Sequence, residues 1–317
     1  MRETSPPLAA PTVPALMAEL ATPAGEADPY PVYERLRELG DPLPGPDDSL
    51  IVTGYRHCSA LLREPRLRKN PGRLLVASGY PDWEQHPSLA LMFRSMLMLN
   101  PPEHTRVRRL VAGVFTARRV SAMRPAVQLI ADRLLDDLTE RGAAGAAVDF
   151  VDAVAFPFPV TVIGELLGVP EADRPMFRRL VDDWSRVLEI LNPPAVDQAD
   201  AAAEAIIDYF TALANRRRAA PADDLISALA GAGNGNSDGN GDEPGLTNEE
   251  LVRTVALILA AGFETTTGLL ANGLVALLAH PAEAERLRRA PELARSAVEE
   301  LLRYDTPVQM TYGRTAV

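Results

Sequence analysis

A carboxylate and several hydroxyl groups interrupt the longest apolar stretch of this chain. The segment is Ala261-Gly262-Phe263-Glu264-Thr265-Thr266, and residues 251–260 and 268–279 on either side are almost wholly apolar. Burying such polar groups without partners is costly, so they must be hydrogen-bonded, hydrated or functional. Glu264 and Thr265 are an acid and an alcohol side by side, and such groups can relay protons to something bound nearby.

The local geometry of this segment leaves two interpretations open. Neighbouring side chains do not share one helix face, and a threonine such as Thr265 often bonds back to the carbonyl four residues earlier, here Ala261. Gly262 has no side chain at the same level, so a flat ligand could approach the backbone. The same residues also fit a polar notch filled by ordered water or by a polar side chain of another helix.

Two further motifs could bind ions, and each also has a plain structural interpretation. His104 and Arg108 follow Pro102 at the start of a predicted helix and share one face, where they could donate to an anionic group. The alternative is a basic, solvated helix face. Glu300 and Arg303, three residues apart in a later helix, are close enough to pair, although most such pairs are solvated surface contacts.

Helices must position nearly all of these residues. Ala, Leu and Arg dominate and aromatic residues make up only 5% of the chain, so helix is the expected default. The longest helix is predicted to start at a capping box of Thr247 and Glu250 and to end near His280. The other predicted helices cover residues 33–39, 55–62, 102–115, 117–141, 155–167, 171–190, 198–218 and 222–230, and two short ones begin at Pro281 and Pro291.

The remaining segments are expected to be strands, loops or linkers. Residues 50–53 and 308–317 read as short extended segments. We expect residues 1–28 to form a flexible arm and residues 70–100 a long irregular connection, of a kind that often binds ligands. Residues 231–245 are rich in Gly and Asn and predict a flexible linker.

Composition excludes several classes of protein. The formal net charge of −11 argues against a nucleic-acid-binding surface. Cys58 is the single cysteine, so no intrachain disulfide can form and a cytoplasmic setting is expected. The long apolar helix contains Arg253 and Glu264, which argues against a membrane span.

Taken together and in order, three segments resemble the cytochrome P450 family, particularly its soluble bacterial members. They are PPEHTRVRR at 101–109, AGFETT at 261–266 and EELLR at 299–303. The segments at 50–62 and 306–314 fit as well. The resemblance implies a mainly α fold with small β-sheets, the cytochrome P450-like fold. Residues 29–317 would form an incomplete P450 domain, in which the C-terminal part of that fold is missing. It also implies a haem b cofactor.

The resemblance implies a role for each motif residue. Glu264 and Thr265 would be the catalytic acid–alcohol pair that steers protons during oxygen activation. Ala261 and Gly262 would line the oxygen groove, and His104, Arg108 and Arg314 would contact the haem propionates. Glu300 and Arg303 would form a structural ion pair. Phe263 and Val308 would lie in the substrate pocket.

The resemblance further implies a cysteine thiolate on the haem iron, in a Gly-rich loop after the E-x-x-R helix. Residues 1–317 contain no such loop, and Cys58 lies in an amphipathic helical segment without neighbouring glycines. No metal ligand is therefore assigned. We expect a C-terminally truncated chain that is inactive alone.

The function implied is that of a haem-thiolate monooxygenase of secondary metabolism. It would use O2, take electrons from a ferredoxin-type donor and oxidise an apolar small molecule, without contacting nucleic acid or membrane. The alternative is a haemless P450-like auxiliary protein that activates a partner enzyme such as a glycosyltransferase. Retention of Glu264, Thr265 and the propionate donors disfavours it, because a haemless scaffold has no chemical need for them.

Overall fold

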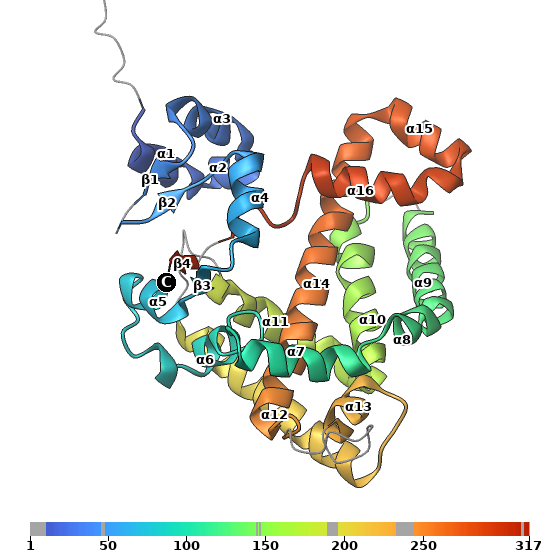
Figure 1. Ribbon diagram of the computed structural model, residues 1–317. Coiled ribbons are helices and arrows are strands. Elements are labelled where there is room, and N and C mark those ends of the chain that lie inside the picture. Colours follow the sequence, from blue (N-terminus) through green and yellow to red (C-terminus); the bar gives the residue numbers. More distant parts are fainter. Residues whose placement is uncertain are drawn as a thin grey trace, which may run out of the picture. The chain divides into compact units, whose positions relative to one another are not determined.

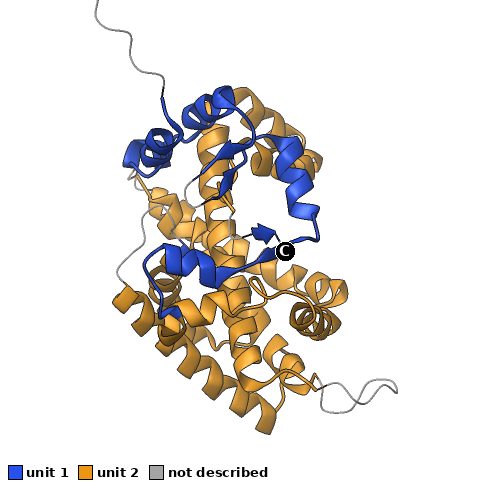
Figure 2. Ribbon diagram, turned by 60° about the vertical axis from the view of Figure 1, so that its left-hand side comes forward, with its two compact units in different colours: residues 1–83, 188–194, 313–317 blue, residues 84–187, 195–312 orange. Residues whose placement is uncertain are grey.

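The computed structural model describes residues 11–45, 48–143, 145, 147–188, 196–232, 244–311 and 314–316. These residues are mainly helical with two small sheets, as predicted (Figure 1). The chain divides into two compact units (Figure 2). Unit 1 comprises residues 1–83, 188–194 and 313–317, and unit 2 comprises residues 84–187 and 195–312.

Unit 1 combines short helices with both two-stranded sheets. Its elements are α1 (Val13–Leu20), α2 (Pro23–Ala27), α3 (Tyr30–Leu39), β1 (Leu43–Pro44), β2 (Leu50–Ile51), α4 (Tyr55–Arg63), β3 (Leu67–Lys69), α5 (Pro71–Ala77) and β4 (Arg314–Ala316). Strands β1 and β2 pair antiparallel, with Leu43 opposite Ile51. Strands β3 and β4 also pair antiparallel, with Lys69 opposite Arg314.

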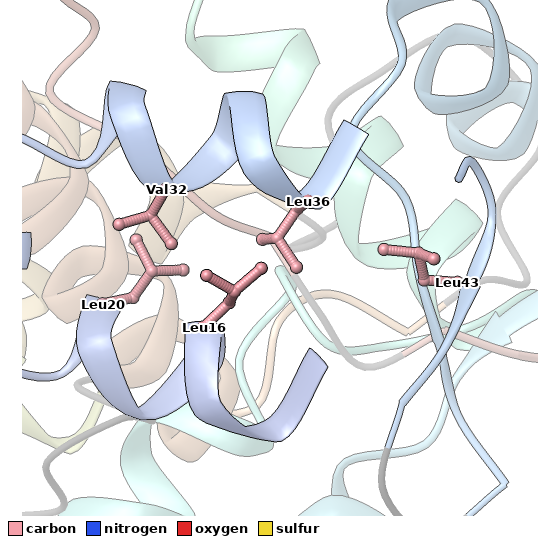
Figure 3. Packing of buried hydrophobic residues seen from close by; sticks show 5 residues of the cluster. All are labelled: Leu16, Leu20, Val32, Leu36 and Leu43. Atoms are coloured by element: carbon pink, nitrogen blue, oxygen red, sulfur yellow. The ribbon is translucent and has the colours of Figure 1, made fainter. Parts of the chain in front are cut away.

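The prediction of a flexible arm is wrong for residues 11–28, and residues 1–10 lie outside the described part of the chain. Leu16 and Leu20, one turn apart on α1, pack with Val32 and Leu36 of α3 and with Leu43 (Figure 3). The hydroxyls of Thr12 and Thr22 cap α1 and α2. Burial of this apolar stripe and two N-caps give the segment its order.

Unit 2 is built almost entirely from helices. Its elements are α6 (Pro87–Phe93), α7 (Glu103–Val114), α8 (Ala117–Ala122), α9 (Arg124–Gly142), the π-helical turn η2 (Val151–Ala155), α10 (Pro157–Leu167), α11 (Arg174–Ser185), α12 (Val196–Ala219), α13 (Leu225–Gly231), α14 (Asn248–Ala279), α15 (Pro281–Arg289) and α16 (Ala294–Tyr304). Short 3-10 turns, η3 (Glu171–Asp173) and η5 (Pro291–Leu293), precede α11 and α16, and η4 (Arg186–Leu188) follows α11.

Three predicted segments differ from the structure. Residues 70–100 are not irregular, because they contain α5, the 3-10 turn η1 (Trp83–Gln85) and α6, whose residues Leu89 and Phe93 are buried. The helix predicted over 117–141 is two helices, since Pro125 sits at the start of α9 and begins a new one. Of the predicted linker 231–245, residues 231–232 end α13, and residues 233–243 lie outside the described residues.

Helix α14 is the central element of unit 2 and is about 48 Å long at the standard rise per residue. The predicted capping box of Thr247 and Glu250 is confirmed. Helices α10 and α12 pack against α14 and bury its first half, including Leu251, Val255 and Leu259. Helix α14 is long and apolar enough to cross a membrane, but the core helix of a soluble protein can have the same length and composition.

A buried carboxylate joins the ends of three helices in unit 2. Asp224, 4% exposed, accepts a hydrogen bond of 2.7 Å from the backbone N–H of Ser227 and so caps α13. It also pairs with Arg217 of α12, whose guanidinium donates to the carbonyl of Gly168 at 2.8 Å. Gly168 ends α10 with φ of +74°, and a side chain there would collide with Asp224. This cluster therefore fixes α10, α12 and α13 to one another.

Replacing Asp224 with Ala should lower the free energy of unfolding by about 3 kcal/mol, because it leaves the partly buried Arg217 without its carboxylate and α13 without its cap. Urea unfolding followed by circular dichroism measures the change. The matched control is Asp208→Ala, an exposed aspartate of α12, which should change stability by less than about 0.5 kcal/mol. Equal effects of both variants would contradict the assignment.

Candidate functional site on helix α14

The Ala261–Thr265 segment remains α-helical and presents its polar side chains on one stripe. Ala261 and Glu264 are exposed and Thr265 is partly buried. Ala261 lies three and four residues before the other two and so neighbours both, while Glu264 and Thr265 are about 100° apart around the helix. The hydroxyl Oγ1 of Thr265 donates a hydrogen bond of 2.7 Å to the carbonyl of Ala261, as predicted. An acid and an alcohol thus lie together at an open face of α14.

Gly262 and Phe263, which lie between Ala261 and Glu264 in the sequence, pack against another segment of unit 2. A Cβ atom on Gly262 would lie 2.6 Å from Cδ1 of Ile163 on α10, so the glycine admits the close approach of another helix. Phe263 is 4% exposed, and its ring meets that of Phe156 edge to face at 4.5 Å. Both residues thus take part in the packing between α14 and the η2–α10 segment, and their roles in an oxygen groove and in a substrate pocket stay predictions.

The segment that carries Val308 is held beside the polar stripe. Gly268 lies one turn beyond Glu264, and a Cβ atom there would be 2.8 Å from Cβ of Pro307. Val308 follows directly and is 55% exposed. Sequence reasoning did not identify Phe156, Ile163 or Pro307, because no local pattern in the sequence indicates which distant residues touch AGFETT.

Helix α7 is fastened to the start of α14 rather than to its centre. Arg106 forms an ion pair with Glu250 and donates to the carbonyl of Gly245 at 3.4 Å. His104 and Arg108 lie on either side of Arg106 and one turn from each other. Arg108 is exposed and has no ion pair within the part of the chain that the structure describes, so its guanidinium is available for an anion.

Glu300 and Arg303 form the predicted pair on α16. Both bonds of the guanidinium to the carboxylate are short, 2.8 and 2.7 Å, and hydrogen bonding from Arg303 lowers the pKa of Glu300. The two side chains are 59% and 69% exposed and line an open groove of about 660 Å³ together with Arg295 and Glu299. The intervening Leu301 packs against Gly273 and so docks α16 on α14.

Arg314 belongs to unit 1, where it faces a second cation. It lies opposite Lys69 in the β3–β4 ladder. Burial lowers the pKa of Lys69, and the charge of Arg314 lowers it further. Like charges directly opposite in a sheet repel each other, and a bound anion would relieve the repulsion.

Cys58 does not have the surroundings of a metal ligand. It lies on α4 in unit 1, and its thiol donates to the carbonyl of Val52 at 3.5 Å. Burial, and next the charge of Asp41, raise the pKa of the Cys58 thiol, which disfavours the thiolate that binds metals. Among the described residues, no three His, Cys, Asp or Glu side chains gather as a metal site.

Comparison with known proteins decides the family. The cytochrome P450 family model matches residues 73–317. The chain is 39% identical over 300 residues to the cytochrome P450 monooxygenase PikC of Streptomyces venezuelae, covering 92% of this chain and 66% of PikC. It is 36% identical to 6-deoxyerythronolide B hydroxylase of Saccharopolyspora erythraea, covering 92% and 71% of the two chains. The chain belongs to the cytochrome P450 family.

The fold of this P450 also matches solved structures. P450BioI, crystallised in complex with an acyl carrier protein ligated to hexadec-9Z-enoic acid, superposes with a TM-score of 0.80 at 29% identity, covering 92% of this chain and 72% of that one. Residues 1–317 thus span about two thirds of the length of the first relatives.

Haem carries two carboxylate groups, which cationic side chains are suited to bind. In unit 2, Arg108 carries a guanidinium without an ion pair among the described residues, and in unit 1 Lys69 and Arg314 face each other across a strand pair; each of these places could bind an anionic carboxylate. The open stripe of Ala261, Glu264 and Thr265 suits one face of the macrocycle. The iron ligand is the part that does not fit, because Cys58 is a protonated thiol on α4.

Replacing Cys58 with Ala should leave the haem content of the purified natural protein unchanged, since the thiol is bonded to Val52 and is held in its protonated form. Haem per chain, measured by the pyridine haemochrome spectrum, checks this. Arg314→Ala serves as the comparison and should lower haem retention. Loss of haem in Cys58→Ala alone would make Cys58 the ligand and contradict the prediction.

Proposed function

We propose that residues 1–317 belong to a haem-thiolate monooxygenase that oxidises an apolar small molecule. The overall reaction converts R–H, O2, two electrons and two protons into R–OH and water. The observation that carries the proposal is the stripe of Glu264 and Thr265 with its hydrogen bond to Ala261, set between two largely apolar stretches of the long helix of a P450 chain.

Thr265 can hold a proton donor in place because of its own hydrogen bond. Its single hydroxyl hydrogen is directed at the carbonyl of Ala261, so Oγ1 presents its lone pairs as acceptors. A water molecule that donates to Oγ1 is thereby oriented towards the stripe. The exposed Glu264 carboxylate can take a proton from solvent and pass it to that water, which is the general acid role.

Haem b is the proposed cofactor, and it supplies the activation of dioxygen when bound. His104, Arg108 and Arg314 would hold its propionates through charge-assisted hydrogen bonds. Glu300 and Arg303 keep α16 in one conformation through their two-bond pair and take no part in proton transfer. The thiolate ligand lies outside the residues assigned here.

Substrate and partners follow from the exposed side chains and from the relatives. Val308, next to the Pro307 that lies against Gly268 of α14, is 55% exposed, and Met310 is 38% exposed. These apolar side chains favour an apolar substrate, with O2 as co-substrate. Electrons would come from a ferredoxin-type protein, in the cytoplasm. The names of PikC and of the hydroxylase of Saccharopolyspora erythraea are consistent with a role in secondary metabolism.

The cofactor assignment is tested by the absorption spectrum of the natural protein after reduction under carbon monoxide. A Soret band typical of thiolate-ligated haem supports the proposal. Protein that is folded but takes up no haem would overturn it and favour the auxiliary, haemless class.

Replacing Thr265 with Val should reduce product formed per electron pair by about tenfold, because the oriented water loses its acceptor. Product and hydrogen peroxide are measured together with the electron supply held constant. Thr267→Val is the matched control, since Thr267 makes the same back-bond, 2.9 Å to the carbonyl of Phe263, from a different side of α14. Equal losses in both variants would show a structural effect and count against the assigned role.

A further inference from the structure

The turn η2, directly before α10, is π-helical. In η2 the backbone N–H of Phe156 donates to the carbonyl of Val151 at 2.9 Å, a π-helical bond. The carboxylate of Asp149 caps the turn by accepting from the N–H groups of Val151 and Asp152 at 2.9 and 3.1 Å. Single π turns are rare in helical proteins and occur frequently at functional sites.

The π turn places the ring of Phe156 between two partners. On one side the ring of Phe263 meets it at 4.5 Å with an interplanar angle of 76°. Against the Phe156 ring also lies the guanidinium of Arg178 from α11, with Cζ 4.3 Å from the ring centroid. Arg178 is in turn paired with Asp152 of the same π turn. The ring is therefore held by an edge-to-face contact and a cation–π contact together.

This contact acts on the α14 segment that carries the polar stripe. Phe263 directly precedes Glu264, and its carbonyl accepts the hydroxyl of Thr267. Ile163 fills the space beside Gly262, immediately before Phe263. Successive helix residues are rotated by about 100° around the axis, so fixing Gly262 and Phe263 against the η2–α10 segment also fixes the direction of Glu264 and Thr265.

We infer that Phe156 is a positioning residue for Glu264 and Thr265, held in place by Arg178 and Asp152. The inference rests on the proposed function for its chemical consequence. Its structural content, that Phe156 determines the order of residues 261–267, is independent of haem. Phe156 itself lies behind the helix and needs no contact with any reacting atom.

The first experiment measures amide hydrogen exchange of residues 261–267 in the natural protein carrying Phe156→Leu. Exchange should accelerate about two- to tenfold, the range that corresponds to loss of an aromatic pair. Phe156→Tyr keeps the ring and should restore the slow exchange. The control is Phe177→Leu, a buried aromatic residue of α11 that stacks on Phe210 at 5.4 Å and is not part of this contact.

The second experiment uses an exposed side chain that does not endanger folding. Arg178→Gln removes the cation and should raise the ratio of hydrogen peroxide to product about two- to fivefold. The neighbouring Arg179 is 85% exposed and pairs with Asp183, so Arg179→Gln is a matched control and should leave the ratio unchanged. A merely structural role of Arg178 would change stability without changing this ratio.

The outcomes separate the two proposals. If Phe156→Leu and Phe177→Leu alter exchange over 261–267 equally, the positioning role is overturned, whether or not the protein binds haem. If exchange changes only with Phe156→Leu but the natural protein takes up no haem, the positioning of the segment stands and the monooxygenase proposal falls. A normal peroxide ratio in Arg178→Gln overturns the part assigned to Arg178.

Discussion

Helix α14 can accommodate a carboxylate and a hydroxyl within an apolar stretch because an adjacent part of its surface is anchored to the η2–α10 segment by close packing. The anchor is the contact of Gly262 with Ile163 and of Phe263 with Phe156. Burial of an aromatic side chain such as Phe263, which is 4% exposed, contributes about 2–3 kcal/mol. The polar stripe thus results from packing of only part of the helix surface. Glu264 and Thr265 lie outside the packed part and are therefore accessible for chemistry.

The anchor depends on α10, and α10 is fixed at both of its ends. At its start the π turn η2 delivers Phe156 to α14. At its end Gly168 lies against Asp224, which Arg217 joins to α12. Helix α10 is therefore restrained at two points about 16 Å apart along its axis. Small shifts of a helix held in this way are resisted by dense packing along its whole length.

The sequence allowed the site residues to be found but not the way in which they are held. Periodicity and the capping box of Thr247 and Glu250 located α14 to within one residue at each end. The back-bond of Thr265 follows from local geometry alone and was predicted correctly. The direction of Gly262 was not predictable, because a missing side chain suits a ligand and a neighbouring helix equally well. Only the fold shows that Ile163 occupies that space.

The same reasoning explains why residues 11–28 and 70–100 were mistaken for loops. Both are interrupted by prolines, which mark irregular segments when they fall inside an element. Here Pro71 and Pro87 sit in the first turns of α5 and α6, where the missing N–H costs nothing. Their order comes from burial of apolar residues such as Leu20, which packs with Leu16, Val32 and Leu36, and Phe93, which is 3% exposed.

The arginine side chains of the chain differ in how their charges are balanced. Arginines that hold helices together have carboxylate partners within the chain: Arg106 pairs with Glu250, and Arg217 pairs with Asp224. Arg108, by contrast, is exposed without a described counter-ion, and Arg314 faces another cation across a strand pair. The chain has a net charge of −11 and so an excess of carboxylates, and the pairing of Lys69 opposite Arg314 therefore does not follow from composition. An anion bound beside this strand pair would reduce the repulsion between the two side chains.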